Sequence, residues 1–478
     1  MAAQRKEEKN QLFLGLFIHS VELGKLEYIH DAAICVDRSG NIVALETSCD
    51  RKKAEEEIYP KLGWTAGDVT VTIAKDGQFF FPGFIDTHLH APQYPNVGIF
   101  GNSTLLDWLN TYTFPMEASF SALPKARRVY TRVIRQTLSH GTTTAAYYAT
   151  IHVPATNLLA DLCFSMGQRA FVGRVCMDNL GPDYYLDESP TASLSATQAT
   201  IDHIRSIDPS FDLITPILTP RFAPACTRDV MTGLGKMHIE TGLPIQTHIS
   251  ENINEIQLVR EIFPDCENYA DVYDKFGLLG RKTILAHAIH LTEEEADLIA
   301  GKGSKVAHCP CSNSALTSGE ARVRWLLEKG IGVGLGTDMS GGYSPSMLEA
   351  ARQAAMVSNH RAMPAGKWAD VPAGEREHAK LSVAEVLHLA TRGGAEVVGL
   401  ADKVGAFEVG KQWDAQLVGL GLVGDAPDEH DMADTGNVDI FGWETWEERI
   451  AKWVFNGDDR NVKKVWVKGR LVHERQQD

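Results

Sequence analysis

Two histidines, His88 and His90, stand two positions apart at the end of an apolar run, 79–85. Successive side chains of an extended strand point to opposite faces, so these two imidazoles project the same way and can bind one metal ion. Histidine pairs of this spacing also occur on ordinary half-exposed strands, and alone the pair is only moderately specific. It makes a metal-dependent hydrolase the first hypothesis.

Later residues of the same chemical types strengthen this hypothesis. Each lies within or directly after a short β-like run: His248, His287, His308 and Asp338. Imidazole nitrogen and carboxylate oxygen are standard zinc ligands, and a catalytic zinc site keeps one position for water. A set of three nitrogens and one oxygen would come from His88, His90, His248 and Asp338.

Glu251 follows His248 by three residues and is the candidate for proton transfer. Metal coordination can lower the pKa of water to about 7, and a nearby carboxylate can then move the protons. In the alternative interpretation, Glu251 is a helix-start glutamate that the helix dipole stabilises, with Ser250 as a possible cap. Both interpretations could hold together.

The elements that must position these residues alternate between short apolar runs and longer helical stretches. The predicted strands are 84–90, 142–148, 170–177, 213–219, 245–250, 283–287, 305–308 and 331–337. This alternation is typical of βαβ units and a parallel sheet, and eight strands predict an α/β fold with a closed (β/α)₈ TIM-like barrel. Active sites of such barrels lie at the carboxyl ends of the strands, so the candidate residues converge on one rim.

Both chain ends are β-like. Strands are predicted within 11–19, 33–37, 42–46, 414–419 and 462–473, with no helical period of useful length in the first eighty residues. We expect a small β-sandwich formed by both ends, with the chain divided into 1–80, 81–404 and 405–478. The acidic stretch 424–439 is rich in Gly, Pro and Asp and is expected to be a surface loop.

The composition limits the partners. The 478-residue chain has 46 basic and 62 acidic side chains, a formal charge of −16, which repels phosphate backbones and anionic lipids. We therefore expect no nucleic-acid partner and no membrane partner. Eight cysteines are scattered without a framework pattern, and no cleavable leader is evident, so the chain is expected to be cytoplasmic.

Cys309 and Cys311 follow His308 and raise the question of a second zinc site. The two cysteines are only one residue apart, and no further cysteine pair lies nearby to complete a tetrahedral set. We expect Cys309 to pack as a small hydrophobic side chain. The role of Cys311 stays open.

Several segments together resemble the guanine deaminases of the amidohydrolase superfamily. The first metal motif of the superfamily is similar to FPGFIDTHLHAPQY at 81–94, and the guanine deaminase branch is similar to LDWLNTYTFPME at 106–117. Shorter matches lie at 219–222, 248–252, 308–310 and 336–338. The resemblance covers about 81–400, with weaker support in the two β-like ends.

The resemblance implies hydrolytic deamination of guanine to xanthine and ammonia, in purine catabolism, at one Zn²⁺ per chain. The metal ligands would be His88, His90, His248 and Asp338. The catalytic residues would be Glu251 as proton shuttle, His287 near the attacking water, and Asp338. The substrate would be held by Gln93, Arg221 and Phe222, with contacts from His248, Glu251 and Asp338. The resemblance also favours a homodimer.

Other interpretations stay open. Arg221 could pair with a rim carboxylate, and Phe222 could belong to the core. A related amidohydrolase could act on another aminated heterocycle with the same metal ligands. A relative that has lost catalysis could be a scaffold, although such relatives typically lack metal ligands that this chain retains.

Overall fold

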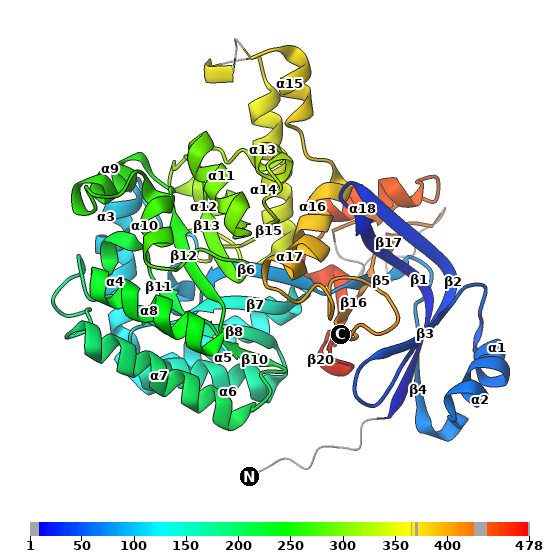
Figure 1. The fold of residues 1–478 in the computed structure, drawn as a ribbon. Coiled ribbons are helices and arrows are strands. Elements are labelled where there is room, and N and C mark those ends of the chain that lie inside the picture. The colour runs from blue at the N-terminus through cyan, green and yellow to red at the C-terminus, as the bar shows by residue number, and fades with distance from the viewer. Residues whose placement is uncertain (1–8, 365, 369–370, 425–436, 477–478) are drawn as a thin grey trace.

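The computed structural model describes residues 9–364, 366–368, 371–424 and 437–476. A ring of strands surrounded by helices lies beside a sheet built from the two ends of the chain (Figure 1). Most of the acidic stretch 424–439 lies outside the described residues. Among the helices of the described part, none is both long enough and apolar enough to cross a bilayer.

The ring consists of two parallel four-stranded halves. The first half, in spatial order, is β10 (Ile214–Pro216), β8 (Arg169–Gly173), β7 (Thr142–Tyr148) and β6 (Phe84–His90). The second half is β12 (Ile245–Ile249), β13 (Thr283–His287), β14 (Lys305–His308) and β15 (Val333–Leu335). The third and fourth predicted strands each divide in two, because β9 (Val175–Cys176) and β11 (Thr219–Pro220) form a separate pair.

Hydrogen bonds join the two halves at both seams. The amide of Asp338, just after β15, donates to the carbonyl of His88 on β6 at 2.8 Å. At the other seam Gln246 donates to the carbonyl of Leu218 at 2.9 Å. The predicted (β/α)₈ barrel is therefore confirmed, with its strand ends at one rim.

Helices cover the outside of the ring (Figure 1). Those that follow the first four strands are α3 (Leu105–Trp108), α4 (Phe114–Ala118), α5 (Leu123–Ser139), α6 (Val153–Met166), α7 (Pro190–Ile207) and α8 (Arg228–Thr241). Those that follow the later strands are α9 (Ile253–Ile262), α10 (Tyr269–Lys275), α11 (Glu293–Lys302), α12 (Pro310–Ala315), α13 (Val323–Glu328), α14 (Met347–Ala362), α15 (Ala373–His378), α16 (Val383–Ala390) and α17 (Arg392–Val397).

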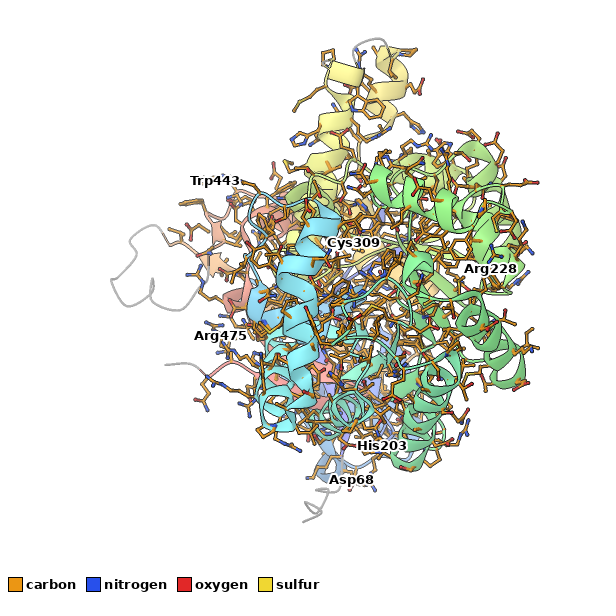
Figure 2. All side chains as sticks on the ribbon, turned by 90° about the vertical axis from the view of Figure 1, so that its left-hand side faces the viewer. Asp68, His203, Arg228, Cys309, Trp443 and Arg475 are labelled. Atoms are coloured by element: carbon orange, nitrogen blue, oxygen red, sulfur yellow. The ribbon has the colours of Figure 1, made fainter. Side chains whose placement is uncertain are left out.

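Helix α5 illustrates why these segments are helical. Its buried residues Tyr130, Val133, Ile134 and Leu138 recur every three or four positions and form one apolar face toward the barrel. Charged residues occupy the outer surface, as Figure 2 shows for Arg228 at the edge of the molecule.

The two chain ends build one β unit, as predicted, and its strands form a single eight-stranded sheet. The spatial order is β20-β19-β16-β5-β1-β2-β3, and β4 pairs with β1. The bounds are β1 (Asn10–Glu22), β2 (Lys25–Val36), β3 (Ile42–Glu46), β4 (Val69–Ile73), β5 (Gln78–Pro82), β16 (Ala415–Gly419), β19 (Val462–Val467) and β20 (Arg470–Glu474). Outside this sheet, β17 (Gly421–Leu422) pairs with β18 (Asp439–Ile440). Phe13 of β1 stacks on Trp413 with ring centroids 4.1 Å apart, which joins the first and last parts of the chain in one aromatic core.

Two helical segments in the chain ends were not predicted. The first comprises α1 (Arg51–Lys53), a π-helical turn (Ala54–Ile58) and α2 (Tyr59–Leu62), and the second is α18 (Trp446–Asn456). Each is short, and in α18 the buried residues Ile450, Trp453 and Val454 show the helical spacing. The ends are β-like, as predicted, and these helical segments are added to their strands.

Gly83 alone separates β5 of the end sheet from β6 of the barrel. Its amide donates to the carbonyl of Asp414 at 3.0 Å, in the C-terminal part of the chain. A Cβ at this position would lie 2.1 Å from Oγ1 of Thr143, so only glycine fits the close approach.

Candidate active site

The seam between β6 and β15 brings three of the predicted ligands together. Asp86 on β6 accepts hydrogen bonds from the amide of Thr337 at 3.0 Å and from its hydroxyl at 2.6 Å. The amide of Asp338 donates to the carbonyl of His88 at 2.8 Å. The segment after β15 is thereby fixed against β6, and the Asp338 carboxylate reaches His88 and His90.

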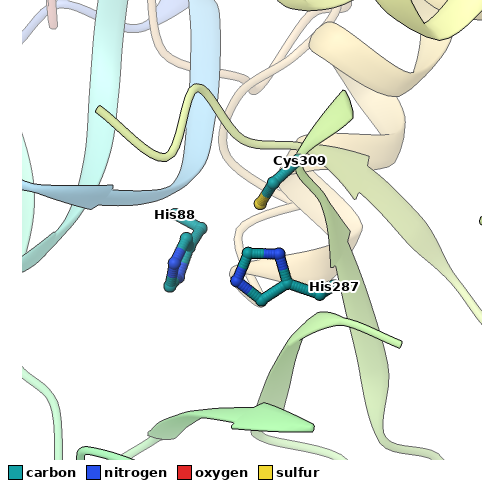
Figure 3. A group of neighbouring side chains, drawn as sticks. All are labelled: His88, His287 and Cys309. Atoms are coloured by element: carbon teal, nitrogen blue, oxygen red, sulfur yellow. The ribbon is translucent and has the colours of Figure 1, made fainter. Parts of the chain in front are cut away.

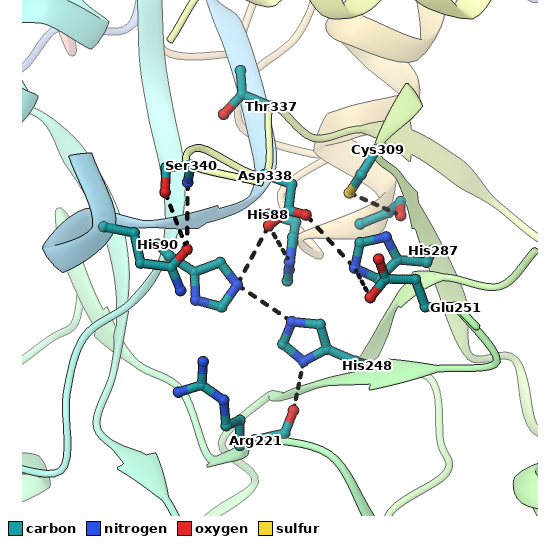
Figure 4. Close-up of polar contacts among 12 residues, drawn as sticks. His88, His90, Arg221, His248, Glu251, His287, Cys309, Thr337, Asp338 and Ser340 are labelled. Atoms are coloured by element: carbon teal, nitrogen blue, oxygen red, sulfur yellow. Dashed lines mark hydrogen bonds and ion pairs between the residues drawn. The ribbon is translucent and has the colours of Figure 1, made fainter. Parts of the chain in front are cut away.

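The four predicted ligands form one cluster (Figure 4). Oδ1 of Asp338 lies 3.2 Å from Nε2 of His88 and 3.4 Å from Nε2 of His90. Nε2 of His90 lies 3.3 Å from Nε2 of His248. Ligand atoms about 2.0–2.1 Å from a tetrahedral zinc ion are about 3.3–3.4 Å from each other, so these separations fit one zinc site.

The protonation of the three histidines also fits a cation. Burial lowers the pKa of His88, and it lowers the pKa of His90 and His248 further because neighbouring histidines add to the effect. Nδ1 of His248 donates to the carbonyl of Arg221 at 2.5 Å, which leaves a lone pair on Nε2. Nε2 of His88 is buried without a hydrogen-bond partner in the described part of the chain. Neutral imidazoles whose free nitrogens face one another are suited to hold a metal ion.

The predicted metal ligand Asp338 is held ionised by its surroundings. Burial acts to raise its pKa, but the neighbouring histidines His88, His287 and His248 outweigh this effect and lower the pKa to about 2. An ionised carboxylate beside neutral imidazoles gives the ligand set one negative charge, which would offset part of the charge of a divalent cation.

Glu251 and His287 form an acid–base pair beside this cluster. Oε2 of Glu251 lies 3.4 Å from Nε2 of His287, and the hydroxyl of Ser318 donates to Oε1 of Glu251 at 3.1 Å. Nδ1 of His287 donates to Oδ1 of Asn313 at 2.9 Å. Burial raises the pKa of Glu251 to about 7, while Glu251 and Asp338 outweigh burial and raise the pKa of His287. A carboxyl group with a pKa near neutrality can both accept and deliver protons.

Glu251 is not the first-turn glutamate of a helix, and Ser250 is not the cap. Helix α9 begins at Ile253, its N-cap is Asn252, and Glu255 completes the capping box. The alternative interpretation of Glu251 is therefore wrong: Ser250-Glu251 and Asn252-Glu255 both carry suitable residue types, and the second pair is the one that caps the helix. With the capping role removed, Glu251 points toward His287 instead (Figure 4).

The backbone is strained around this cluster. Among the described residues other than glycine, Ser250, His287, Ala288 and Asp338 have φ values of 49°, 72°, 51° and 44°. The left-handed region costs such residues of order 1–3 kcal/mol, and positions of this kind cluster at functional sites. Here they turn the chain sharply at the ends of β12, β13 and β15.

A second group of potential ligands consists of His88, His287 and Cys309 (Figure 3). Both groups contain His88, so two ions could not be bound by the two complete groups at the same time. Burial raises the pKa of the Cys309 thiol well above its usual value, and the thiol donates to the carbonyl of Ala307 at 3.5 Å. A buried protonated thiol favours the packing role predicted for Cys309. Cys311 is also buried, within α12.

His308 is separate from the cluster. It ends β14 but lines a different cavity, of about 130 Å³, beneath α13, α14 and α15. Like the predicted ligands, His308 stands at the end of a predicted strand. The sequence alone could not show that its side chain turns to the outside of the barrel.

One small cavity joins the metal cluster to the predicted substrate residues. Its volume is about 30 Å³. Its polar lining is His90, Gln93, Arg221, His248, Glu251, Glu255, His287 and Asp338. Its apolar lining is Leu105, Trp108, Leu109, Phe222 and Leu316.

Glu117 connects the predicted substrate residues and was not itself predicted. Arg221 donates to both of its carboxylate oxygens, at 2.6 and 3.1 Å, and Nε2 of Gln93 donates at 2.7 Å. The hydroxyl of Tyr185 donates at 2.8 Å, and the Arg221 guanidinium lies 5.1 Å from the centre of the Phe114 ring. Arg221 therefore pairs with a carboxylate, but Glu117 is fully buried behind the cavity lining and is not the rim carboxylate of the alternative interpretation. Tyr185 carried no sequence signal.

Comparisons with known proteins agree with this geometry. A family model described as the amidohydrolase family matches residues 79–472. The chain is 50% identical to a probable guanine deaminase of Schizosaccharomyces pombe, over 96% of this chain and 83% of that protein. It is 40% identical to the guanine deaminase of Dictyostelium discoideum, over 97% and 98%. A crystal structure of guanine deaminase from C. acetobutylicum, with guanine bound in the active site, is similar with a TM-score of 0.83 and 33% identity, over 97% of this chain and 100% of that one.

Proposed function

This chain belongs to the amidohydrolase family, and we propose from this premise that it hydrolyses guanine to xanthine and ammonia. Relatives 40–50% identical over nearly the whole chain carry the name guanine deaminase, and one structural neighbour holds guanine in its active site. The observation that carries the proposal is a single cavity lined both by metal-ligand candidates, His90 and His248, and by base-reading side chains, Gln93 and Arg221.

We propose that the cofactor is one zinc ion per chain. The ligands would be His88, His90, His248 and Asp338. The separations of their donor atoms and the lowered pKa of the histidines support zinc. When bound, zinc supplies Lewis-acid chemistry that lowers the pKa of water and stabilises negative charge on the substrate.

The protein's own residues would move the protons. Glu251, with Asp338, takes a proton from the attacking water, whose oxygen forms a bond to C2 of guanine, and Glu251 delivers that proton to the adjacent ring nitrogen. A second proton passes from the new hydroxyl to the amino group, and the C–N bond breaks to release ammonia. His287, 3.4 Å from Glu251, is placed to hold the attacking oxygen by a hydrogen bond.

Recognition of the base would come from the opposite wall. An amide such as Gln93 and a guanidinium such as Arg221 suit the fixed donors and acceptors of a flat purine, and Phe222 could cover its face. His248, Glu251 and Asp338 would contact the base at the reacting carbon.

We further propose a cytoplasmic homodimer that acts in purine catabolism. The absence of disulfides among the eight cysteines supports a reducing compartment. Light scattering of the purified protein would measure the oligomeric state, and a monomer at micromolar concentration would contradict the dimer.

The test of the activity is an assay with guanine on purified protein. We expect stoichiometric xanthine and ammonia, loss of turnover after chelation, and recovery when zinc is added back. Adenosine and an aminated triazine serve as competing substrates. Good turnover of either one with negligible turnover of guanine would overturn the choice of substrate. A folded protein that zinc cannot activate on any of them would favour the scaffold.

A further inference from the structure

Glu117 is a fully buried carboxylate, and the hydrogen-bond partners that the described residues give it include none of the predicted metal ligands. The described side chains give it four hydrogen bonds, two from Arg221 and one each from Gln93 and Tyr185. A carboxylate has about four lone-pair positions, so these donors saturate it. The question is what such a saturated anion does in the wall of a substrate pocket.

Its first effect is to determine which end of the Gln93 amide faces the substrate. An ionised carboxylate only accepts hydrogen bonds, so the NH₂ group of Gln93 must turn toward Glu117. The amide oxygen then faces the other way, toward Ser340, whose backbone amide and hydroxyl each lie 3.5 Å from it. Gln93 also lines the cavity, and both Ser340 contacts are long, so the group of Gln93 that is left to bind a substrate is the acceptor.

Its second effect is to hold the donor group beside that acceptor. Both terminal nitrogens of Arg221 are bonded to Glu117, and Phe114 lies against the guanidinium. Arg221 is buried and cannot rotate without breaking both bonds. Its remaining N–H groups can donate only in the directions that this geometry leaves free.

We propose that Glu117 is a positioning residue that fixes the hydrogen-bond polarity of the base-reading wall. Through it, Gln93 accepts from a ring N–H and Arg221 donates to a carbonyl oxygen or ring nitrogen. The selected ligand class is thus a purine base with a donor–acceptor pattern like that of guanine. This inference rests on the proposed function, because it concerns how the same pocket selects its substrate.

The decisive variant is Glu117→Gln, tested with guanine and with 2,6-diaminopurine. The second base has the same leaving group at C2 but the reverse donor and acceptor at positions 1 and 6. A glutamine at position 117 brings an NH₂ group among four donors and frees the Gln93 amide to turn. We expect KM for guanine to rise roughly 10- to 100-fold, kcat to fall less, and the preference for guanine to drop at least about tenfold. Zinc content should not change.

Two further variants separate positioning from simple loss of structure. In the charge-conserving exchange of Gln93→Glu with Glu117→Gln, a carboxylate at position 93 again presents an acceptor to the cavity, so KM should recover to within about tenfold of the wild type. Tyr185→Phe removes one donor without a charge change and should raise KM about 2- to 5-fold. If Glu117→Gln does not fold, the KM of Tyr185→Phe still tests the positioning role.

Asp414→Asn is the matched control. Asp414 is an equally buried carboxylate that accepts from Arg169 at 3.0 and 3.2 Å, outside the pocket. We expect this variant to lose stability while KM and base preference stay at wild-type values. If Glu117→Gln keeps the wild-type KM and preference, or if the exchange variant is no better than Glu117→Gln, the positioning role is wrong. If the wild type itself does not turn over guanine, it is the proposed function that fails.

Discussion

The barrel carries a buried polar cluster at each end, and the two differ in how fully their polar atoms are paired. At the amino end of β8, Arg169 donates to both carboxylate oxygens of Asp414, to the side chain of Gln412 and to the carbonyl of Asp212. At the carboxyl ends of the strands, Nε2 of His88 and Nδ1 of His90 are buried and make no hydrogen bond within the described part of the chain. A saturated cluster stabilises the fold, whereas buried polar atoms left unpaired mark a place where water, an ion or a ligand can bind.

Mutations in the two clusters are expected to affect different properties of the protein. The Arg169 cluster joins the barrel to the end sheet and needs nothing from solution. The histidine cluster is where we propose that a cation, a water and the substrate bind. Glu117 shows that a saturated cluster can also lie within the functional end, where it orients side chains that are themselves incomplete.

The largest expected effect follows Glu251→Gln in the unsaturated cluster. We expect kcat to fall by up to about 10⁴-fold, because the amide cannot carry the protons, while zinc content stays at the wild-type level. Steady-state kinetics and elemental analysis of the same sample check both statements. Glu295→Gln, at a buried helix-capping glutamate outside the pocket, is the control and should leave kcat unchanged. A Glu251→Gln enzyme with most of its activity would remove the residue from the mechanism.

Arg169→Met should do the opposite and affect stability alone. It leaves the buried Asp414 carboxylate without its cation, so we expect the free energy of unfolding to fall by roughly 3–5 kcal/mol. Chemical denaturation measures this loss, and kcat/KM of the folded fraction should stay within about twofold. Arg228→Met, at an exposed ion pair with Asp265, should cost less than about 1 kcal/mol. A loss of kcat/KM in folded Arg169→Met enzyme would contradict the separation of the two clusters.

A smaller, pH-dependent effect is expected at His388, where α16 meets the end sheet. Its Nδ1 lies 2.8 Å from the Ser20 hydroxyl, and burial, with Arg392, lowers its pKa to about 4. The unfolded chain takes up a proton near pH 6.5, whereas the folded chain does so only near pH 4. The contribution of His388 to the free energy of unfolding is therefore constant above about pH 6.5. It falls by about 2–3 kcal/mol as the pH drops to 4.

His388→Gln tests this pH dependence. The variant should lose less stability than the wild type between pH 7 and pH 4, by the same 2–3 kcal/mol measured in denaturant titrations. Parallel pH curves for the wild type and the His388→Gln variant would contradict the assignment.

The smallest effect is expected at Cys309, which separates the two possible ligand sets. Cys309→Ala should lower the free energy of unfolding by about 1 kcal/mol, because a small buried group is lost, with zinc content and kcat within about twofold of the wild type. Cys163→Ala, another buried cysteine, should cost a similar amount. Loss of the zinc equivalent in Cys309→Ala alone would place sulfur among the ligands.

The sequence predicted the barrel well because its signals are local. Strands β6 and β7 have the predicted bounds, and the spacing of His88 and His90 follows from strand alternation alone. The role of Glu117 could not be predicted, because its partners Tyr185 and Arg221 lie 68 and 104 positions away. Only the closed barrel brings these residues together. The single sheet of the chain ends depends on long-range pairing in the same way, and the limits 1–80, 81–404 and 405–478 remain predictions.

The direct passage from β5 through Gly83 into β6 limits how the enzyme can be shortened or recombined. A catalytic barrel usually invites transplantation as an independent module, but here the strand that carries His88 and His90 continues from the end sheet after one residue. Any cut that frees the barrel falls within a few residues of the catalytic strand and removes the carbonyl of Asp414 that the Gly83 amide needs. The smallest fragment that keeps the intact strand β6 therefore includes the end sheet, and we expect the barrel and the end sheet to be inherited together.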